Sequence, residues 1–245
     1  MVALREVLRV FVLVTVATLV ASYAGRWPGL DEYVPVAVGA LFLWTAVHMS
    51  QRQPEGVRRY GLALGGLLEP PERPPAGLLA SARDLAHALL RAAPSGAREL
   101  GVALLLAAVI FPPFALGFWS WHGPSRPFAL ALPPELGSYL STQLLVVALP
   151  EEALFRGYMQ SRLSEGLGGP RRFLGAQLSV PAWLWQAGLF ALLHFAVEPY
   201  PARLAVFFPA LAFGWLRALR GGIGASAAFH ALCNLFSDIL ARSWL

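Results

Sequence analysis

Long apolar stretches occupy most of this 245-residue chain, and they restrict its fold more than any other feature. A helix needs about 20 mostly apolar residues to cross the hydrocarbon core of a bilayer. The stretches that approach this length are residues 8–25, 33–49, 101–119, 138–159, 178–197, 202–218 and 222–240. We therefore expect an all-α, polytopic transmembrane helical bundle, with about seven to eight membrane helices enclosing a polar cavity.

The composition favours the same class of protein. Charged residues make up 13% of the chain and hydrophobic residues 57%, whereas soluble domains carry about 25% charged residues. The net charge of +5 does not require a nucleic-acid partner, because arginines can lie at the cytoplasmic ends of membrane spans. The single cysteine, Cys233, excludes an internal disulfide and any metal site built from several cysteines.

The distribution of arginines predicts the orientation in the membrane. All 19 basic residues are arginines. With a cytoplasmic N-terminus and seven spans, only Arg26, Arg126, Arg203 and Arg242 lie outside, and the other 15 lie inside. Loops on the cytoplasmic side carry an excess of arginine and lysine. We therefore expect an uncleaved first span, a cytoplasmic N-terminus and an odd number of spans.

Residues 50–100 form the longest stretch without a span, and prolines interrupt it at positions 70, 71, 74 and 75. Beyond them, apolar residues recur at helical spacing at Leu78, Ala82, Leu85 and Leu89. This pattern predicts either an amphipathic helix on the inner leaflet or a connector packed on other cytoplasmic loops. The chain is accordingly divided into residues 1–100, with the first spans and this segment, and a core of residues 101–245.

Two adjacent carboxylates in the stretch 138–159 are the first candidates for chemistry, because ionisable groups inside a membrane are costly. Glu152 and Arg156 are four positions apart and can pair on a helix. Glu151 is rotated by about 100° from Glu152 and faces elsewhere. Pro150 removes the helical donor for the carbonyl of Val146 and loosens the helix beside the carboxylates. The alternative is a charge cluster that reaches the membrane edge.

Polar residues in two later stretches complete the candidate set. His194 follows Phe190 by one helical turn, and each taken alone is more often a structural residue than a catalytic one. His230 and Asn234 share one helical face, which indicates either a hydrated site or hydrogen bonds between helices. Together these groups can support hydrolysis, because a carboxylate and a histidine can activate water. A second histidine and an amide can stabilise the resulting oxyanion.

Three ordered motifs resemble those of the CAAX prenyl protease and bacteriocin-processing (CPBP) family, also called the abortive-infection family. They are Glu151-Glu152-x-x-x-Arg156, Phe190-x-x-x-His194 and His230-x-x-x-Asn234. The resemblance implies a helical membrane fold around a hydrophilic cavity, located in the bacterial inner membrane. It also implies an intramembrane endopeptidase that cleaves membrane-anchored or lipidated protein substrates near their C-terminus, as in CAAX processing or the removal of a C-terminal sorting signal.

The resemblance also implies roles for individual residues. Glu151 would activate water with help from His194, and His230 with Asn234 would form the oxyanion site. Glu152, Arg156 and Phe190 would support these groups.

No metal or other cofactor is expected, although Glu151, His194 and His230 make a His₂Glu set of the kind that holds catalytic zinc. Against zinc, the two histidines come from separate spans, and His194 has no visible partner for its second ring nitrogen, whereas Asn234 can act with His230.

Two other functions are compatible with the same residues. One is a non-catalytic membrane partner or immunity protein on the same fold. The other is a proton-coupled transporter that uses Glu151, His194 and His230 as a relay, although no inverted repeat is evident.

The span layout also places Arg156 near the inner face and His194 near the outer end of its span. Wrong span boundaries, a tilted or broken helix near Pro181, or a deep cavity would each bring them together.

Overall fold

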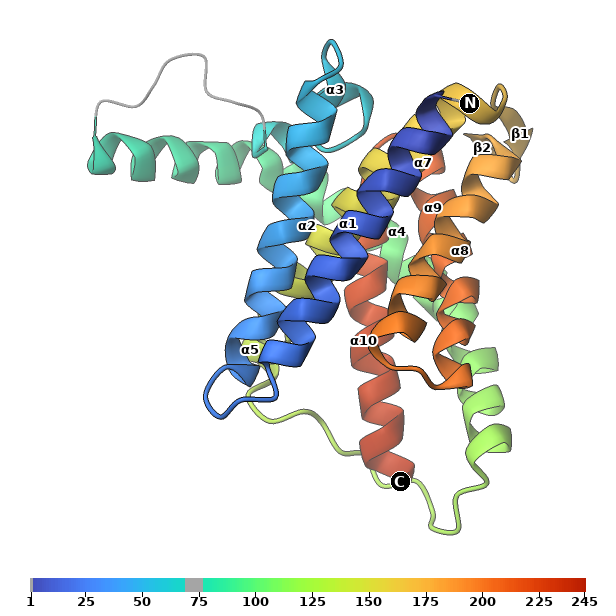
Figure 1. The fold of residues 1–245 in the computed structure, drawn as a ribbon. Coiled ribbons are helices and arrows are strands. Elements are labelled where there is room, and N and C mark those ends of the chain that lie inside the picture. The colour runs from blue at the N-terminus through green and yellow to red at the C-terminus, as the bar shows by residue number, and fades with distance from the viewer. Residues whose placement is uncertain (1, 69–76) are drawn as a thin grey trace.

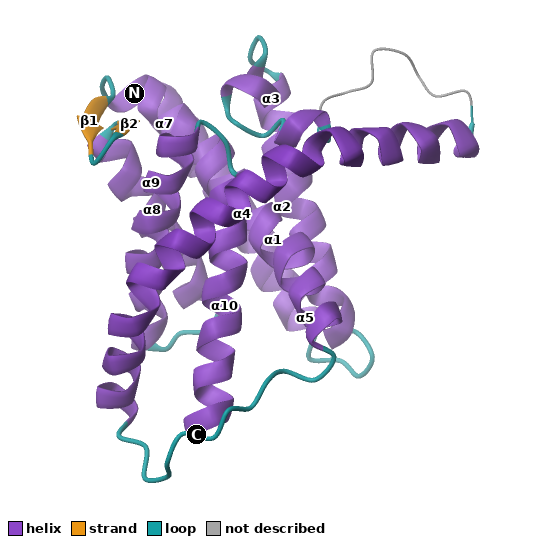
Figure 2. Cartoon of the chain, turned by 180° about the vertical axis from the view of Figure 1, so that it is seen from behind, coloured by secondary structure: helices purple, strands orange, loops and turns teal. Residues whose placement is uncertain are grey.

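The chain folds into a bundle of long helices, as the apolar stretches predict (Figures 1 and 2). The computed structural model describes residues 2–68 and 77–245. The single long helices are α1 (Val2–Ala24), α2 (Val34–Gln51), α4 (Leu78–His122), α8 (Val180–Val197), α9 (Phe207–Arg220) and α10 (Gly224–Trp244). The shorter helical segments between them are η1 (Asp31–Tyr33), α3 (Gly56–Arg59), η2 (Leu64–Gly66) and η5 (Pro201–Val206).

A further helical run extends without interruption from Leu136 to Leu167 and contains both candidate carboxylates. Its successive parts are α5 (Leu136–Thr142), η3 (Gln143–Ala148), α6 (Leu149–Glu152), η4 (Ala153–Met159) and α7 (Gln160–Leu167). The parts η3 and η4 are π-helical, with wider turns than an α-helix, and such turns are frequent at functional sites.

Five helical segments of the described chain are long and apolar enough to cross a membrane. They are Val2–Ala24, Asp31–Gln51, Ser81–His122, Val180–Val197 and Pro201–Arg220. The two remaining predicted spans are also helical, but they are the run 136–167 and α10, which carry the polar candidates. The protein is thus an all-α, multi-pass membrane protein, and the run and α10 contribute Glu152, Arg156 and His230 to its interior.

Helix α4 is one continuous helix, whereas the sequence predicted an amphipathic segment before residue 100 and a separate span at residues 101–119. It continues through residue 100, and its first part projects sideways from the bundle before the helix turns into it (Figure 1). Leu85, Leu89 and Leu90 of this lateral part are exposed, so no other part of the described protein covers its apolar face. The proline-containing stretch 70–75 lies outside the described residues, as does the side chain of Leu78.

Pro150 and Gly39 explain how the helical run packs against α2. Proline has no N–H, so the carbonyl of Val146 loses its helical donor. A Cβ atom at Gly39 would lie 2.5 Å from that carbonyl oxygen. Only glycine therefore permits α2 to approach the run this closely, just before the two carboxylates.

Two apolar clusters flank the interior of the bundle. The larger joins α1, α2, the run and α8, and it includes Phe42, Phe155 and Phe190. The smaller joins α4, α9 and α10, and it includes Phe213 and Phe229. Because Phe190 and Phe213 belong to different clusters, residues between these two rings lie where the two halves of the bundle meet.

A short antiparallel hairpin, which the sequence analysis did not anticipate, joins the run to α8. Strand β1 (Arg171–Phe173) pairs with β2 (Ala176–Leu178), with Arg172 opposite Gln177. Leu174 and Gly175 both have positive φ angles of 45° and 82°, as a two-residue type I′ turn requires.

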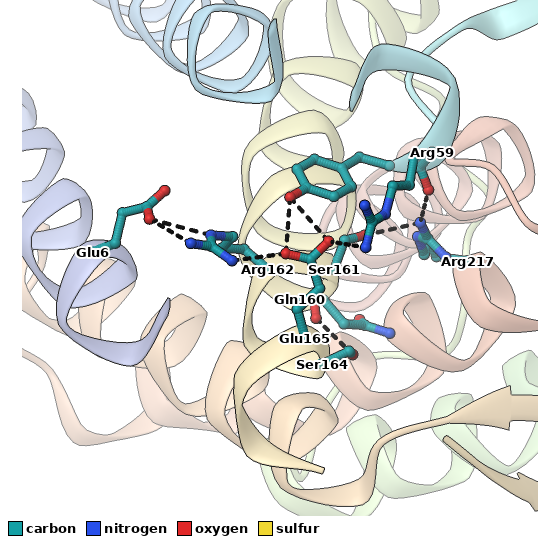
Figure 3. A network of polar contacts seen from close by, with 9 residues as sticks. Glu6, Arg59, Gln160, Ser161, Arg162, Ser164, Glu165 and Arg217 are labelled. Carbon is teal, nitrogen blue, oxygen red and sulfur yellow. Dashed lines mark hydrogen bonds and ion pairs between the residues drawn. The ribbon is translucent and has the colours of Figure 1, made fainter. Parts of the chain in front are cut away.

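A polar network ties the helices together at the end of the bundle where the chain begins (Figure 3). Arg162 of α7 lies 2.8 Å from both Glu6 of α1 and Glu165. The hydroxyl of Tyr60 donates to Glu165 at 3.2 Å. Burial, together with the nearby Glu165 carboxylate, raises the pKa of Tyr60 to about 12. The network therefore stays intact throughout the physiological pH range.

The fold predicts which loops share a side of the membrane. Single cysteines introduced at Val2 and at Gln51, in a Cys233→Ala background, should both be labelled from the same side of the membrane. A cysteine at Ser125 should react only on the other side, because the long helices between these exposed positions each cross the bundle. The measurement is labelling with a membrane-impermeant thiol reagent before and after permeabilisation. Labelling of Ser125→Cys from the same side as Val2→Cys would contradict the arrangement.

Candidate active site

The predicted pair of Glu152 and Arg156 is confirmed and is completely buried. The two side chains have no exposed surface, and Arg156 Nη1 lies 2.9 Å from Glu152 Oε1. A charge inside a low-dielectric interior is tolerated when an opposite charge compensates it. Arg156 therefore compensates the charge of Glu152.

Three aromatic rings enclose the guanidinium of Arg156. Its Cζ lies 4.2 Å from the ring centre of Phe190, 5.0 Å from that of Phe213 and 5.8 Å from that of Phe155. Cations are attracted to the faces of aromatic rings, and more strongly where water is excluded. Phe190 thus supports Arg156 as well as the histidines, and Phe213 is a member of the site that the sequence analysis missed.

His230 connects the two carboxylates. Its Nδ1 lies 3.0 Å from Glu152 Oε1, and its Nε2 lies 3.7 Å from Glu151 Oε2. A carboxylate paired with an arginine accepts hydrogen bonds, so the Nδ1–H group of His230 donates a hydrogen bond to Glu152. The ring stacks on Phe213 at 4.6 Å and meets Phe190 edge-on at 5.9 Å. These contacts fix the ring so that Nε2 faces Glu151.

Glu151 differs from Glu152 in its exposure and in having no ion pair with Arg156. Its side chain is 17% exposed, and its Oε2 has no hydrogen-bond partner among the described residues. The separation of 3.7 Å from His230 is too long for a direct hydrogen bond, but one water can contact both groups. One carboxylate is therefore held by Arg156 while its neighbour remains open, as the helical offset predicts.

His194 has the ring-nitrogen partner that the sequence analysis failed to find. Its Nδ1 lies 2.9 Å from the carbonyl oxygen of Phe190. A carbonyl can only accept, so the proton is on Nδ1 and the lone pair of a neutral ring is on Nε2. The ring centres of His194 and Phe190 are 4.3 Å apart. Phe190 thus contacts both histidines, and it is the residue through which His194 is connected to His230.

Asn234 lies one turn beyond His230, but its side chain bonds to a residue from another helix. Its Nδ2 donates to Gln143 Oε1 at 2.8 Å, which fixes the orientation of the Asn234 amide. The sequence analysis did not identify Gln143. An uncharged polar residue inside a predicted span was the available signal, since such residues commonly bond across helices. Further along α10, Asp238 pairs with Arg242 at 2.6 Å and stays outside the site.

The zinc-like set of Glu151, His194 and His230 does not converge on a common point. Among the described residues, no three His, Cys, Asp or Glu side chains are close enough together to hold one metal ion. The ring nitrogen Nδ1 of His230 is also committed to Glu152. In this arrangement the residues fit a bound water better than a tetrahedral metal centre, which needs three protein ligands at about 2 Å.

The structure bears on the apparent mismatch in depth between Arg156 and His194, because the predicted stretch 138–159 ends earlier than the helix does. The helical run continues to Leu167, and Glu151 and Glu152 lie midway along it. Helix α8 is unbroken, with Pro181 in its first turn. Arg156 therefore lies deep enough to contact Phe190, one turn before His194.

The comparison with protein families agrees with this geometry. Residues 133–236 match the model of a family described as type II CAAX prenyl endopeptidase, Rce1-like. The match includes all three motifs and Gln143. This part of the chain is similar to the CAAX endopeptidase family. No curated protein and no solved structure matches the chain significantly. The family match confirms the resemblance that the three motifs suggested, and it leaves the role of each residue to be tested.

The buried pair predicts that Arg156 is needed mainly for stability. Arg156→Ala leaves Glu152 as an unpaired buried charge, which costs roughly 3–5 kcal/mol. We expect strongly reduced accumulation and a lower unfolding temperature in detergent. The matched control is Arg242→Ala, which removes an i,i+4 pair that is partly exposed and contributes about 0–1 kcal/mol. Wild-type stability of Arg156→Ala would contradict the prediction and give Arg156 a direct chemical role.

Proposed function

We propose that this protein is an intramembrane endopeptidase that cleaves membrane-anchored or lipidated protein substrates near their C-terminus. One observation carries the proposal: Glu151 is partly exposed and lies 3.7 Å from His230 without a hydrogen bond to it, while the adjacent Glu152 is compensated by Arg156 and orients His230. The similarity of residues 133–236 to the CAAX endopeptidase family supports the reaction class. CAAX-type processing, or removal of a C-terminal sorting signal, is the specific reaction that we infer.

Glu151 is the general base in the proposed mechanism. It removes a proton from a water that lies between its carboxylate and His230, and the water oxygen attacks the carbonyl carbon of the scissile peptide bond. The tetrahedral intermediate then collapses, and protonated Glu151 returns its proton to the departing amine. This sequence needs no oxidant, reductant or further reactant, and it uses the same carboxylate as base and then as acid.

The two histidines and Asn234 have different tasks in this mechanism. His194 has its Nε2 lone pair free because Nδ1 donates to Phe190, so it can accept a hydrogen bond from the attacking water. When His230 is doubly protonated, its Nε2 also donates and can stabilise the oxyanion. The second N–H of Asn234 is not used by Gln143 and can donate to the same oxygen. Preorganised donors of this kind are commonly the largest contribution to acyl-transfer catalysis.

The proposed location is the bacterial inner membrane, with a cytoplasmic N-terminus. The arginine excess lies at the end of the bundle that contains the N-terminus and the Figure 3 network, and positively charged loops favour the cytoplasmic side. The lipid bilayer and the lipidated substrate are then the partners, and no nucleic acid is required. A lipid-attached C-terminal segment would reach the site from within the membrane.

The decisive experiment uses purified protein and a lipidated peptide that ends in a CAAX-type sequence. We expect Glu151→Gln to lower turnover by about 10²–10⁴-fold, while insertion and thermal stability stay close to wild type. Mass spectrometry identifies the cleaved bond. The matched control is Glu198→Gln, since Glu198 is exposed and pairs only with Arg203 among the described residues. Normal turnover by Glu151→Gln would remove Glu151 from this role.

The same experiment distinguishes a protease from a non-catalytic partner protein. A non-catalytic partner protein would cleave no peptide, and its cellular phenotype would survive Glu151→Gln. A comparison of membrane proteomes with and without the active protein should reveal substrates with shortened C-termini. Unchanged C-termini throughout, together with no peptide cleavage, would contradict the protease assignment.

Gln143 is expected to act as a positioning residue. Gln143→Leu removes the acceptor for Asn234, so the Asn234 amide loses its fixed orientation, and we expect kcat to fall by roughly tenfold with little change in KM. Gln143→Glu keeps an acceptor oxygen and should retain more activity. Equal activities of wild type and Gln143→Leu would show that Asn234 needs no such partner.

We further propose that catalysis needs no bound metal. The expected result is full turnover by enzyme treated exhaustively with a membrane-permeant chelator, and no stoichiometric metal by elemental analysis of the active preparation. Loss of activity on chelation, with recovery when zinc is returned, would recast Glu151, His194 and His230 as ligands in a rearranged site.

A further inference from the structure

A groove lies between α1 and α2, away from the candidate active site. Its volume is about 860 Å³, within the range of about 300–1,000 Å³ that is usual for ligand pockets. Its lining belongs to α1, α2 and Arg52, whereas the candidate catalytic groups come from the helical run, α8 and α10. Figure 1 shows the two helices diverging toward the end of the bundle where the chain begins.

The two ends of the groove differ in chemistry. Toward the membrane interior its walls are mainly apolar and include Leu13, Val14, Ala17 and Leu41. At the arginine-rich end the charged lining residues are Arg5, Glu6, Arg9 and Arg52. A ligand that fits both parts must combine an apolar chain with an anionic group.

The negative charge of Glu6 does not compensate Arg5 or Arg9. Glu6 accepts hydrogen bonds from Arg162 at 2.8 Å and from Tyr158 at 3.0 Å, and it interacts electrostatically with Arg52. Arg5 and Arg9 have no ion-pair or hydrogen-bond partner among the described residues, and both are exposed. The groove therefore presents two arginines that are not paired within the described part of the protein, beside Arg52.

One wall of the groove positions Arg52. Trp44, His48 and Arg52 follow one another at intervals of four residues on α2 and its C-terminal cap. The rings of Trp44 and His48 stack with centres 5.0 Å apart, and Arg52 Nη2 donates to His48 Nε2 at 3.2 Å. The remaining N–H groups of Arg52 are available to a ligand, and arginine binds phosphate oxygens in a bidentate manner.

We propose that this groove binds one anionic phospholipid of the leaflet at the arginine-rich end. Its phosphate contacts Arg5, Arg9 and Arg52, and part of an acyl chain lies along the apolar section between α1 and α2. The first turn of α1 at the same end adds the positive end of a helix dipole. The proposal is independent of the proteolytic function.

The test uses the full-length protein in an uncharged detergent, with lipid retention measured by native mass spectrometry. Phosphatidylglycerol and phosphatidylcholine with identical acyl chains are the probes. We expect one phosphatidylglycerol to be retained in preference to phosphatidylcholine. The triple variant Arg5→Gln/Arg9→Gln/Arg52→Gln should lose this preference, with about a fivefold loss of affinity for each arginine removed.

The matched control is Arg83→Gln/Arg91→Gln/Arg98→Gln, which removes the same charge from exposed positions of α4. It should retain the lipid as wild type does. Equal retention of the two lipids by the wild type, or equal loss in the test and control variants, would overturn the proposal. If the first triple variant fails to fold, Arg5→Gln/Arg9→Gln serves instead, because it leaves the bond between Arg52 and His48 intact.

Discussion

The ion pair between Glu152 and Arg156 is the interaction on which the interior of this protein depends. Both side chains are completely buried inside a transmembrane helical bundle, where an isolated charge is strongly unfavourable. Glu152 also accepts a hydrogen bond from Nδ1 of His230 in α10. Arg156 lies against Phe190 of α8 and Phe213 of α9. One compensated pair thus links the helical run to three other helices and sets where His230 points.

The different surroundings of Glu151 are a consequence of this pairing. Two adjacent residues of a helix face different directions, so the side chain that does not meet Arg156 turns to the partly open side. Pro150 and the π-helical turns on both sides alter the local backbone, and Gly39 allows α2 to pack against the altered turn. The same local geometry leaves Glu151 beside His230 without a partner of its own. The structure thereby combines a stable buried charge with a neighbouring carboxylate free to bind water.

The sequence predicted the helical class, the seven long helical segments and the pairing of Glu152 with Arg156, because each rests on local patterns. Its predictions were weakest where a helix boundary or an interhelical contact mattered. The end of the stretch 138–159 was set by the change from apolar to polar residues, yet the helix continues to Leu167. The longer helix places Arg156 away from its end, where it contacts Phe190. The lateral first part of α4 and the β1–β2 hairpin also lay beyond what hydropathy indicates.

The sequence by itself therefore determined the contacts between residues of the same helix, because the backbone geometry of a helix fixes them. Glu152 and Arg156 are four residues apart, as are Phe190 and His194, and a helix brings each such pair together. Only the tertiary structure decided that His230 lies between the two carboxylates, that Gln143 holds Asn234 and that Phe213 covers Arg156. These contacts depend on the rotation and depth of each helix. Lipid and helix surfaces are similarly apolar, so hydropathy does not encode those two quantities, and close packing and interhelical hydrogen bonds select them.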